Sequence, residues 1–358
     1  MKFVAPKYYK NFKCIANKCI HNCCMEGWEI DIDNKTAERY KNWPGEIGDK
    51  LRKNINFGNP SQFKLNKKHT CAFLNDNHLC ELCLTIGEEN LCYICKEHPR
   101  YYEWFDGIKE AGVGLCCEEA ARLILSFDEK FSTYEKEIEF DDCDDYDKEL
   151  YNYLFSAREK IINYLDSDGI DIETKIRNIL WYAHTLQQNI DNELLDDEEI
   201  IDIKKLEKND EKINILGSII DFYLKLEPND ITWFSGLEKI KNNSKKYYEN
   251  LNIFNEKNTE KNNYLKNISI YFVWRYFMKA TFDGDVLSRI KLMATSIKII
   301  DFLFFNEFEQ NALSLESAID VVRRYSEEIE YCDENIQCLA DASYEQEIFS
   351  TENLMKLF

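Results

Sequence analysis

The chain lacks the features of membrane and secreted proteins. It has no run of about 18 apolar residues, so we expect no transmembrane helix and no membrane partner. Its first ten residues hold no apolar stretch followed by small residues, which argues against a secretory signal. The sequence therefore predicts a cytoplasmic protein.

Positive charge is also scarce, because 45 Lys and Arg residues stand against 66 Asp and Glu residues. A net charge of −21 repels phosphate backbones, so we expect no nucleic-acid partner. Residues 1–127 carry 18 basic and 17 acidic residues, whereas residues 128–358 carry 27 and 49. The acidic part is either a solvated surface or an attractor for a cationic partner such as a lysine-bearing substrate.

Proline and glycine become rare after residue 115, where only one of five prolines and four of twelve glycines lie. Long apolar periodicity in that part predicts helices, while the first third is rich in loops. We therefore predict a mainly α fold of two domains. Residues 1–127 would form a loop-rich cysteine-cluster domain with minor β structure, and residues 128–358 an all-helical domain.

Caps, turns and breaks in periodicity predict the individual elements. Residues 28–33 alternate as an extended segment, and Asp33 can cap the helix that follows. We predict a loop over 57–68 and a hairpin over 71–80. The predicted helices are 34–41, 46–54, 88–97, 118–126, 145–166, 171–190, 198–207, 211–226, 230–252, 262–281, 286–306 and 313–330, with residues 268–274 buried on all sides.

Eleven of the fourteen cysteines lie within residues 14–117. The cytosol keeps thiols reduced, so clustered cysteines there indicate metal or redox chemistry and not disulfides. Their order is Cys14-x4-Cys19-x3-Cys23-Cys24, then Cys71, Cys80-x2-Cys83, Cys92-x2-Cys95 and Cys116-Cys117.

Two residues between cysteines let a tight turn aim both thiolates at one metal centre. On spacing alone, Cys80, Cys83, Cys92 and Cys95 suit a tetrathiolate zinc site, and the same arrangement can hold an iron–sulfur cluster. The larger donor set suits a cubane or two sites. Adjacent cysteines point in opposite directions in an extended chain, so one can ligate while the other packs or serves a second site.

Three catalytic signatures are missing. No Gly-x-Gly-x-Gly loop follows a strand, so no Rossmann-like nucleotide site is visible. The Cys-x3-Cys-x2-Cys spacing of radical enzymes does not occur. No serine–histidine–acid or cysteine–histidine arrangement supports a hydrolase.

The cysteines and their neighbours resemble the flagellin lysine-N-methylase family, within the wider class of CxxC-CC cysteine-cluster proteins. The resemblance runs through about residue 127, and beyond it covers only general length and helical character. The residues that carry it are Pro6-x-Tyr8-Tyr9-x2-Phe12-x-Cys14, Asn22-Cys23-Cys24-x3-Trp28-x-Ile30-x-Ile32-Asp33, Cys71-x-Phe73-Leu74, Ile86-Gly87-Glu88-Glu89-x-Leu91-Cys92-x2-Cys95-x3-Pro99-Arg100 and Leu115-Cys116-Cys117-Glu118-Glu119-Ala120-Ala121-Arg122-Leu123.

The resemblance implies transfer of methyl groups from S-adenosylmethionine to lysine side chains of flagellin, by a protein with a [4Fe–4S] cluster. His98 stands where the family has an aromatic residue, and Glu118 where it has proline. Cys83 and Cys116 fall outside the family pattern, which leaves the ligand set open, with zinc as the alternative metal. The cysteines matched by position are Cys14, Cys19, Cys23, Cys24, Cys71, Cys80, Cys92, Cys95 and Cys117.

The implied reaction suggests cofactor-binding candidates but no catalytic residue. Arg100 can pair with a cofactor carboxylate, or form a structural bridge to a neighbouring glutamate. Tyr101 and Tyr102, with Trp104, can line a cation site or simply pack in the core. The rival function is a non-catalytic iron–sulfur or zinc-binding protein that senses redox state and binds a partner.

Overall fold

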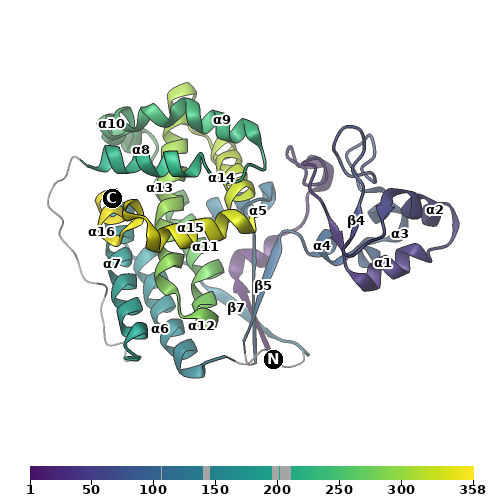
Figure 1. Cartoon of the computed structure of the whole chain (residues 1–358), viewed down its shortest axis with the longest axis horizontal. Coiled ribbons are helices and arrows are strands. Elements are labelled where there is room, and N and C mark those ends of the chain that lie inside the picture. The colour runs from purple at the N-terminus through teal and green to yellow at the C-terminus, as the bar shows by residue number, and fades with distance from the viewer. Residues whose placement is uncertain (106, 140–145, 196–200, 202–210) are drawn as a thin grey trace.

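The computed structural model describes residues 1–105, 107–139, 146–195, 201 and 211–358. Figure 1 shows a small lobe beside a larger helical body. The chain starts in the body with strand β1 (Lys2–Pro6), passes through the small lobe, and returns to the body through β5 (Arg100–Phe105). We call residues 13–99 the cysteine lobe and the remainder the helical body.

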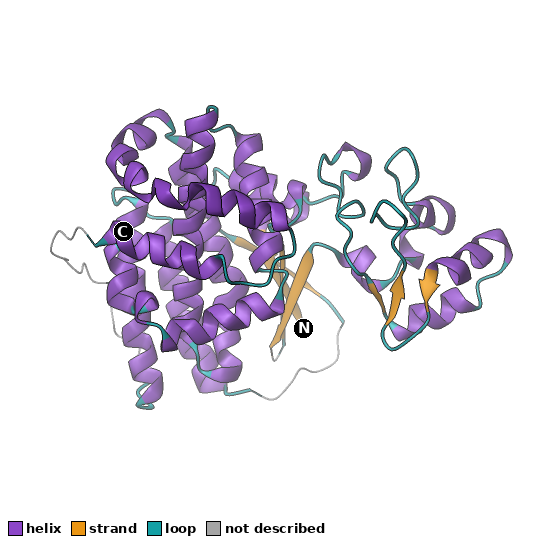
Figure 2. Cartoon of the chain, turned by 45° about the horizontal axis from the view of Figure 1, so that its top comes forward, coloured by secondary structure: helices purple, strands orange, loops and turns teal. Residues whose placement is uncertain are grey.

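A four-stranded sheet lies on the side of the helical body that faces the cysteine lobe (Figure 2). Its order is β5, β6 (Ile108–Val113), β1 and β7 (Thr133–Glu137); β1 runs parallel to β6, and the other pairs are antiparallel. The sequence analysis missed these strands, including β7 in the part predicted to be all helical. Four aromatic residues within the six of β5 were a usable strand signal.

Two buried contacts hold this sheet on the helices. Glu110 of β6 accepts two hydrogen bonds from the guanidinium of Arg158 in α6 (Lys148–Leu165), at 2.6 and 2.7 Å. The indole of Trp274 in α11 (Glu260–Tyr276) donates to the carbonyl of Ala111 at 3.0 Å. The sheet and helices therefore share one core, which extends from Tyr8 to Leu357.

The predicted mainly helical fold class is confirmed. Residues 268–274 in α11 are buried throughout, as their apolar character on every side predicted. None of the described helices has the length and apolar character needed to cross a bilayer. The other body helices are α5 (Glu118–Leu125), α7 (Ile172–Asp191), α8 (Lys212–Tyr223), α9 (Ile231–Ile240), α10 (Ser244–Lys257), α12 (Ala280–Asp283), α13 (Val286–Gln310), α14 (Leu315–Ile329), α15 (Asp333–Glu345) and α16 (Thr351–Lys356).

The cysteine lobe has a separate and much smaller core, in which the ring of Phe63 lies 5.4 Å from Phe73 and 6.2 Å from Tyr40. The division of the chain at residue 127 stays a prediction. The lobe's elements are α1 (Asn34–Lys41), α2 (Gly45–Asn54), α3 (Glu81–Ile86), α4 (Tyr93–Glu97) and a small sheet of β2 (Asp31–Ile32), β4 (Ser61–Phe63) and β3 (Ile55–Asn56).

Most predicted helices are present. The predicted cap of α1 is confirmed, because a carboxylate oxygen of Asp33 accepts the N–H of Thr36 at 2.9 Å. The antiparallel bridge between Leu74 and Cys80 supports the predicted turn. The predicted helix over 198–207 falls mostly on residues 198–200 and 202–207, outside the described part of the chain.

Several boundaries were wrong. The predicted helix over 88–97 is a 3-10 turn followed by α4, because Leu91 and Cys92 are extended between them. The predicted helix over 230–252 is α9 and α10 with a 3-10 turn between them. The loop predicted over 57–68 contains β4, and α15 and α16 were not predicted.

Candidate functional site

Three cysteines lie at the starts of helices. Cys80, Cys92 and Cys117 are the N-cap residues of α3, α4 and α5. The partial positive charge of a helix N-terminus favours the thiolate form that binds metals, although burial raises the pKa of Cys80 and Cys117. In α3 the Cys80 sulfur also accepts the backbone N–H of Cys83 at 3.5 Å.

The fold brings six of the predicted metal-binding cysteines together within the cysteine lobe. The backbone N–H of Cys71 donates to the carbonyl of Cys24 at 3.0 Å, which joins two distant segments. Burial raises the pKa of the Cys71 thiol, and the nearby thiols raise it further. The same mutual influence links the thiols of Cys23, Cys24, Cys71, Cys80, Cys92 and Cys95.

Within this set, two pairs of cysteines share a hydrogen bond. A hydrogen bond from Cys24 lowers the pKa of Cys23, and one from Cys95 lowers the pKa of Cys92. The donating thiols, Cys24 and Cys95, have raised pKa values for the same reason. Each pair therefore offers one thiolate at a lower pH than an isolated cysteine would.

The donor chemistry fits an iron–sulfur cluster or zinc, because soft thiolates suit both. Nevertheless, no group of three or more His, Cys, Asp or Glu side chains in the described ranges converges closely enough to hold a metal ion.

The remaining predicted ligands lie around this set. Cys14 is exposed, and its thiol lies near that of Cys23. Burial raises the pKa of Cys117 to about 12. Cys19 donates its S–H to Glu118 at 3.4 Å. Hence Cys14, Cys19 and Cys117 lie toward the boundary between the cysteine lobe and the helical body.

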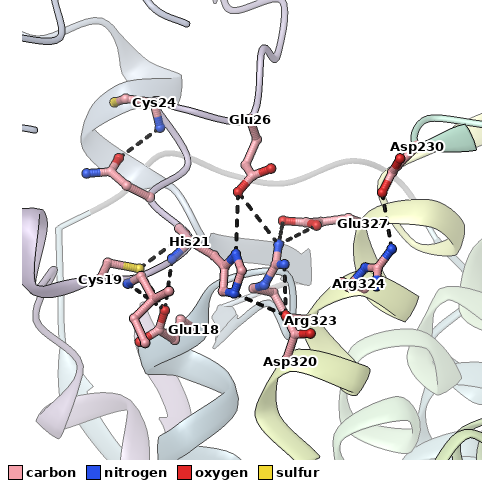
Figure 3. A network of polar contacts seen from close by, with 12 residues as sticks. Cys19, His21, Cys24, Glu26, Glu118, Asp230, Asp320, Arg323, Arg324 and Glu327 are labelled. Atoms are coloured by element: carbon pink, nitrogen blue, oxygen red, sulfur yellow. Dashed lines mark hydrogen bonds and ion pairs between the residues drawn. The ribbon is translucent and has the colours of Figure 1, made fainter. Parts of the chain in front are cut away.

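Glu118 joins the two parts of the molecule (Figure 3). Besides the Cys19 thiol, one oxygen of its carboxylate accepts the backbone N–H groups of Ile20 and His21 at 2.9 and 3.1 Å. The glutamate that departs from the family pattern therefore fixes a loop of the cysteine lobe on the first turn of α5.

A second polar contact lies beside it (Figure 3). Arg323 of α14 pairs with Glu327 on its own helix at 2.6 Å and with Glu26 of the cysteine lobe at 3.9 Å. A ring nitrogen of His21 lies 3.3 Å from a carboxylate oxygen of Asp320, also on α14. Thus α5 and α14 together form the polar surface on which the lobe rests.

The predicted cofactor-binding residues are not brought together. Successive residues of β5 point to opposite faces of the sheet, so Arg100 and Tyr102 lie on one face and Tyr101 on the other. The guanidinium of Arg100 lies 5.0 Å from the ring centre of Phe12. The hydroxyl of Tyr102 donates to Glu97 at 2.6 Å. Of these three residues, only Tyr101 faces the helices, with its ring 6.4 Å from that of Tyr271.

The sequence analysis missed a polar cluster that surrounds Tyr101. The hydroxyls of Tyr271 and Tyr276 donate to one carboxylate oxygen of Glu330 at 2.8 and 2.9 Å, and Arg275 lies 3.2 Å from the same oxygen. It was missed because the sequence pattern of α11 predicts only a buried helix. Nothing in the sequence indicates that α11 packs beside the end of α14. We call Tyr101, Tyr271, Arg275, Tyr276, Glu330 and Tyr331 the arginine–tyrosine cluster.

This cluster lies next to the cysteine lobe. Tyr331 stacks on Trp28, with ring centres 5.7 Å apart, and His98 meets Trp28 edge-on at 5.1 Å. A hydrogen bond joins Tyr331 to Cys116. Gly114 permits this approach, because a Cβ atom there would lie 2.3 Å from the Tyr331 hydroxyl. The arginine–tyrosine cluster therefore borders this edge of the cysteine lobe.

Comparison with known proteins identifies the helical body. A family model described as the FliB lysine N-methylase C-terminal domain matches residues 158–357, which is more than half of the chain. The chain belongs to the FliB lysine N-methylase family. The family predicted from the sequence is thus confirmed, although the prediction rested on the first 127 residues and the family model matches the helices.

The FliB lysine N-methylase relatives include a lysine-N-methylase of Salmonella choleraesuis (strain SC-B67) and one of Salmonella typhimurium. Each is 24% identical over 171 residues, which is 44% of this chain and 39% of the relative. A flagellar biosynthetic protein FliU of Salmonella muenchen is 25% identical over 142 residues, which is 37% of this chain and 81% of that protein. The aligned region is thus about two fifths of the lysine-N-methylases' length. No solved structure matches the chain.

Proposed function

We propose that this chain is an S-adenosylmethionine-dependent lysine N-methylase whose substrate is flagellin. The observation that carries the proposal is the match of the FliB lysine N-methylase domain to residues 158–357. The names of the relatives support both the reaction and a flagellar setting. The acidic helical body suits a lysine-bearing protein substrate. We place the reaction in the cytoplasm, where free thiols persist.

The reaction is a displacement at the sulfonium methyl group. A nitrogen–carbon bond forms on the lysine while the sulfur–carbon bond breaks, and the sulfur leaves with its electron pair as a neutral thioether. The lysine amine must first lose a proton to water or to a base, because free lysine has a pKa of about 10.4. The protein's task is to desolvate the amine and to align it with the methyl group.

We further propose that the cysteine lobe holds a [4Fe–4S] cluster, with zinc as the alternative metal. The hydrogen-bonded cysteine pairs Cys23–Cys24 and Cys92–Cys95 support this proposal. In each pair the hydrogen bond lowers the pKa of one thiol, which favours its thiolate form. Visible absorption and iron analysis of protein purified without oxygen would distinguish the two metals. The ligands would come from Cys14, Cys19, Cys23, Cys24, Cys71, Cys80, Cys92, Cys95 and Cys117.

An anaerobic methyl-transfer assay tests the function. Purified chain, flagellin and S-adenosylmethionine with a labelled methyl group are incubated, and the flagellin is analysed by mass spectrometry. We expect methyl groups on lysine, lost when Cys92 and Cys95 are both changed to serine. Cys338→Ser is the matched control, because it changes an exposed thiol on α15. Unmodified flagellin from metal-loaded protein would rule out this reaction for the chain.

The rival function is a non-catalytic redox sensor. The Cys92–Cys95 pair favours it to some degree, because two hydrogen-bonded thiols can be oxidised together to a disulfide. Binding of S-adenosylmethionine distinguishes the two functions, since a sensor has no need of a methyl donor.

A further inference from the structure

Arg275 has hydrogen-bonding capacity that the protein does not use. Its guanidinium carbon lies 4.9 to 5.2 Å from the ring centres of Tyr101, Tyr276 and Tyr331. Its hydrogen bond to Tyr271 and its ion pair with Glu330 both use Nη1. Among the residues that the structure describes, Nη2 and Nε have no hydrogen-bond partner. The side chain is mostly buried and keeps 12% of its exposure.

Two further polar atoms in the arginine–tyrosine cluster lack partners. The Glu330 side chain is fully buried, and its Oε1 accepts no hydrogen bond from any described residue. The Tyr101 hydroxyl is also buried and unpaired within the described part of the chain. Buried polar atoms nearly always have partners, because an unpaired one loses its hydration without gaining a hydrogen bond. Two of them beside a partly unused arginine indicate a bound ligand.

The unused groups define the ligand's chemistry. Arg275 offers N–H donors to an anion, and a planar guanidinium is well suited to a carboxylate. Glu330 Oε1 offers an acceptor to a cation. A ligand that carries a carboxylate and an ammonium on one carbon satisfies both groups, as the end of an amino acid does. The surrounding rings favour an additional positive charge nearby, such as a sulfonium.

We propose that the arginine–tyrosine cluster binds the methionyl end of S-adenosylmethionine. Arg275 Nη2 and Nε hold the carboxylate, while Glu330 Oε1 and the Tyr101 hydroxyl hold the ammonium. This inference rests on the proposed function, and it replaces Arg100 with Arg275 as the carboxylate-binding arginine. Since Tyr331 stacks on Trp28, the ligand would lie against the edge of the cysteine lobe.

Comparing two ligands tests the role of Arg275. Affinities of the full metal-loaded chain are measured by calorimetry for S-adenosylmethionine and for decarboxylated S-adenosylmethionine, which lacks only the carboxylate. A charge-assisted hydrogen bond predicts a preference of about 10- to 100-fold for the intact molecule. Arg275→Gln should bind both ligands equally. If Arg275→Gln kept the preference, the carboxylate site would be elsewhere.

Tyr101→Phe provides a test that does not depend on how well Arg275→Gln folds. The change removes a hydroxyl without a partner in the chain, so the melting temperature should not fall. We expect an affinity loss of about 5- to 10-fold for both ligands, because both carry the ammonium. Tyr151→Phe is the matched control, since its hydroxyl is also buried and unpaired among the described residues.

The outcomes separate the two proposals. A wild-type chain that binds no S-adenosylmethionine would overturn both the function and this site. Binding that both Arg275→Gln and Tyr101→Phe leave unchanged would overturn this site alone, and the methylase proposal would stand.

Discussion

The cysteine lobe and the helical body are stabilised in different ways. The body has a continuous core of buried residues that extends from Tyr8 to Leu357. The lobe has a core of ten buried apolar residues, and three of its four helices have eight residues or fewer. So small a core stabilises a fold only weakly, and natural domains of this kind depend on metals or cross-links. If the cysteines bind a metal as we propose, they would contribute to the lobe's folding as well as to its chemistry.

Metal removal should have the largest effect on the difference in stability between the two parts. When a chelator strips the metal from loaded protein, we expect the lobe to unfold while the body stays folded, because metal binding and lobe folding are coupled. Hydrogen exchange measures both parts at once. Amides of residues 71–95 should lose protection, and those of α11 and α13 should keep it. Unchanged protection over 71–95 would mean that the apolar core alone stabilises the lobe.

Replacing one buried phenylalanine by alanine in each core tests whether the two cores stabilise their parts independently. Phe272→Ala should lower the unfolding free energy of the body by about 3–5 kcal/mol, because it leaves a cavity in a packed core. Phe73→Ala should destabilise the lobe and leave the body's urea midpoint unchanged. Ile231→Ala is the control, since its side chain is 76% exposed. A shift of the body's midpoint by Phe73→Ala would show that the two parts unfold together.

The free energy of unfolding should depend on pH through Glu327, which lies at the contact between the two parts. Burial raises the pKa of Glu327 to about 7 from an ordinary value of 4.5. Among its charged neighbours, Arg323 on the same helix lowers this pKa, whereas Glu26 of the lobe and Glu328 raise it. The folded protein thus binds the proton more tightly than the unfolded chain. This stabilisation is fully present below pH 4.5 and is lost as the pH rises through about 7.

The expected loss over that pH range is about 3 kcal/mol, and Glu327→Gln should remove it. Urea unfolding at a series of pH values, compared between wild type and variant, measures the difference. Equal pH dependence in the two proteins would mean that folding does not raise the pKa of Glu327.

The smallest effect should come from a helix cap within the lobe. One oxygen of Asp33 caps α1, and the other accepts the N–H of Tyr93 at 3.0 Å, at the start of α4. Asp33→Ala should destabilise the lobe by about 1 kcal/mol. Asp33→Asn keeps a capping oxygen and should cost less. Limited proteolysis of the lobe can rank the three proteins, and equal rates would assign the cap no role in stability.

Local sequence signals predicted the elements that depend on neighbouring residues. The Asp33 cap and the all-round apolar stretch at 268–274 each predicted what the structure contains. Strands β1 and β7 were missed because each depends on a partner far away in the chain. The candidate site was predicted in the same uneven way: the cysteines are obvious from spacing, whereas Arg275 and Glu330 lie 55 positions apart with no motif.

The sequence by itself determined the mainly helical class, because composition and periodicity encode it locally, and its cysteine motifs carried the resemblance that named the family. The same short spacings mark the cysteines as candidate metal ligands, which stays a prediction. Only the tertiary structure decided that Tyr101 and Tyr102 face opposite sides of a sheet and that Glu118 joins the lobe to α5. It alone placed Arg275 and Glu330 in one buried cluster. The physical reason is that strand pairing and helix packing bring together residues whose separation in the chain carries no signal of contact.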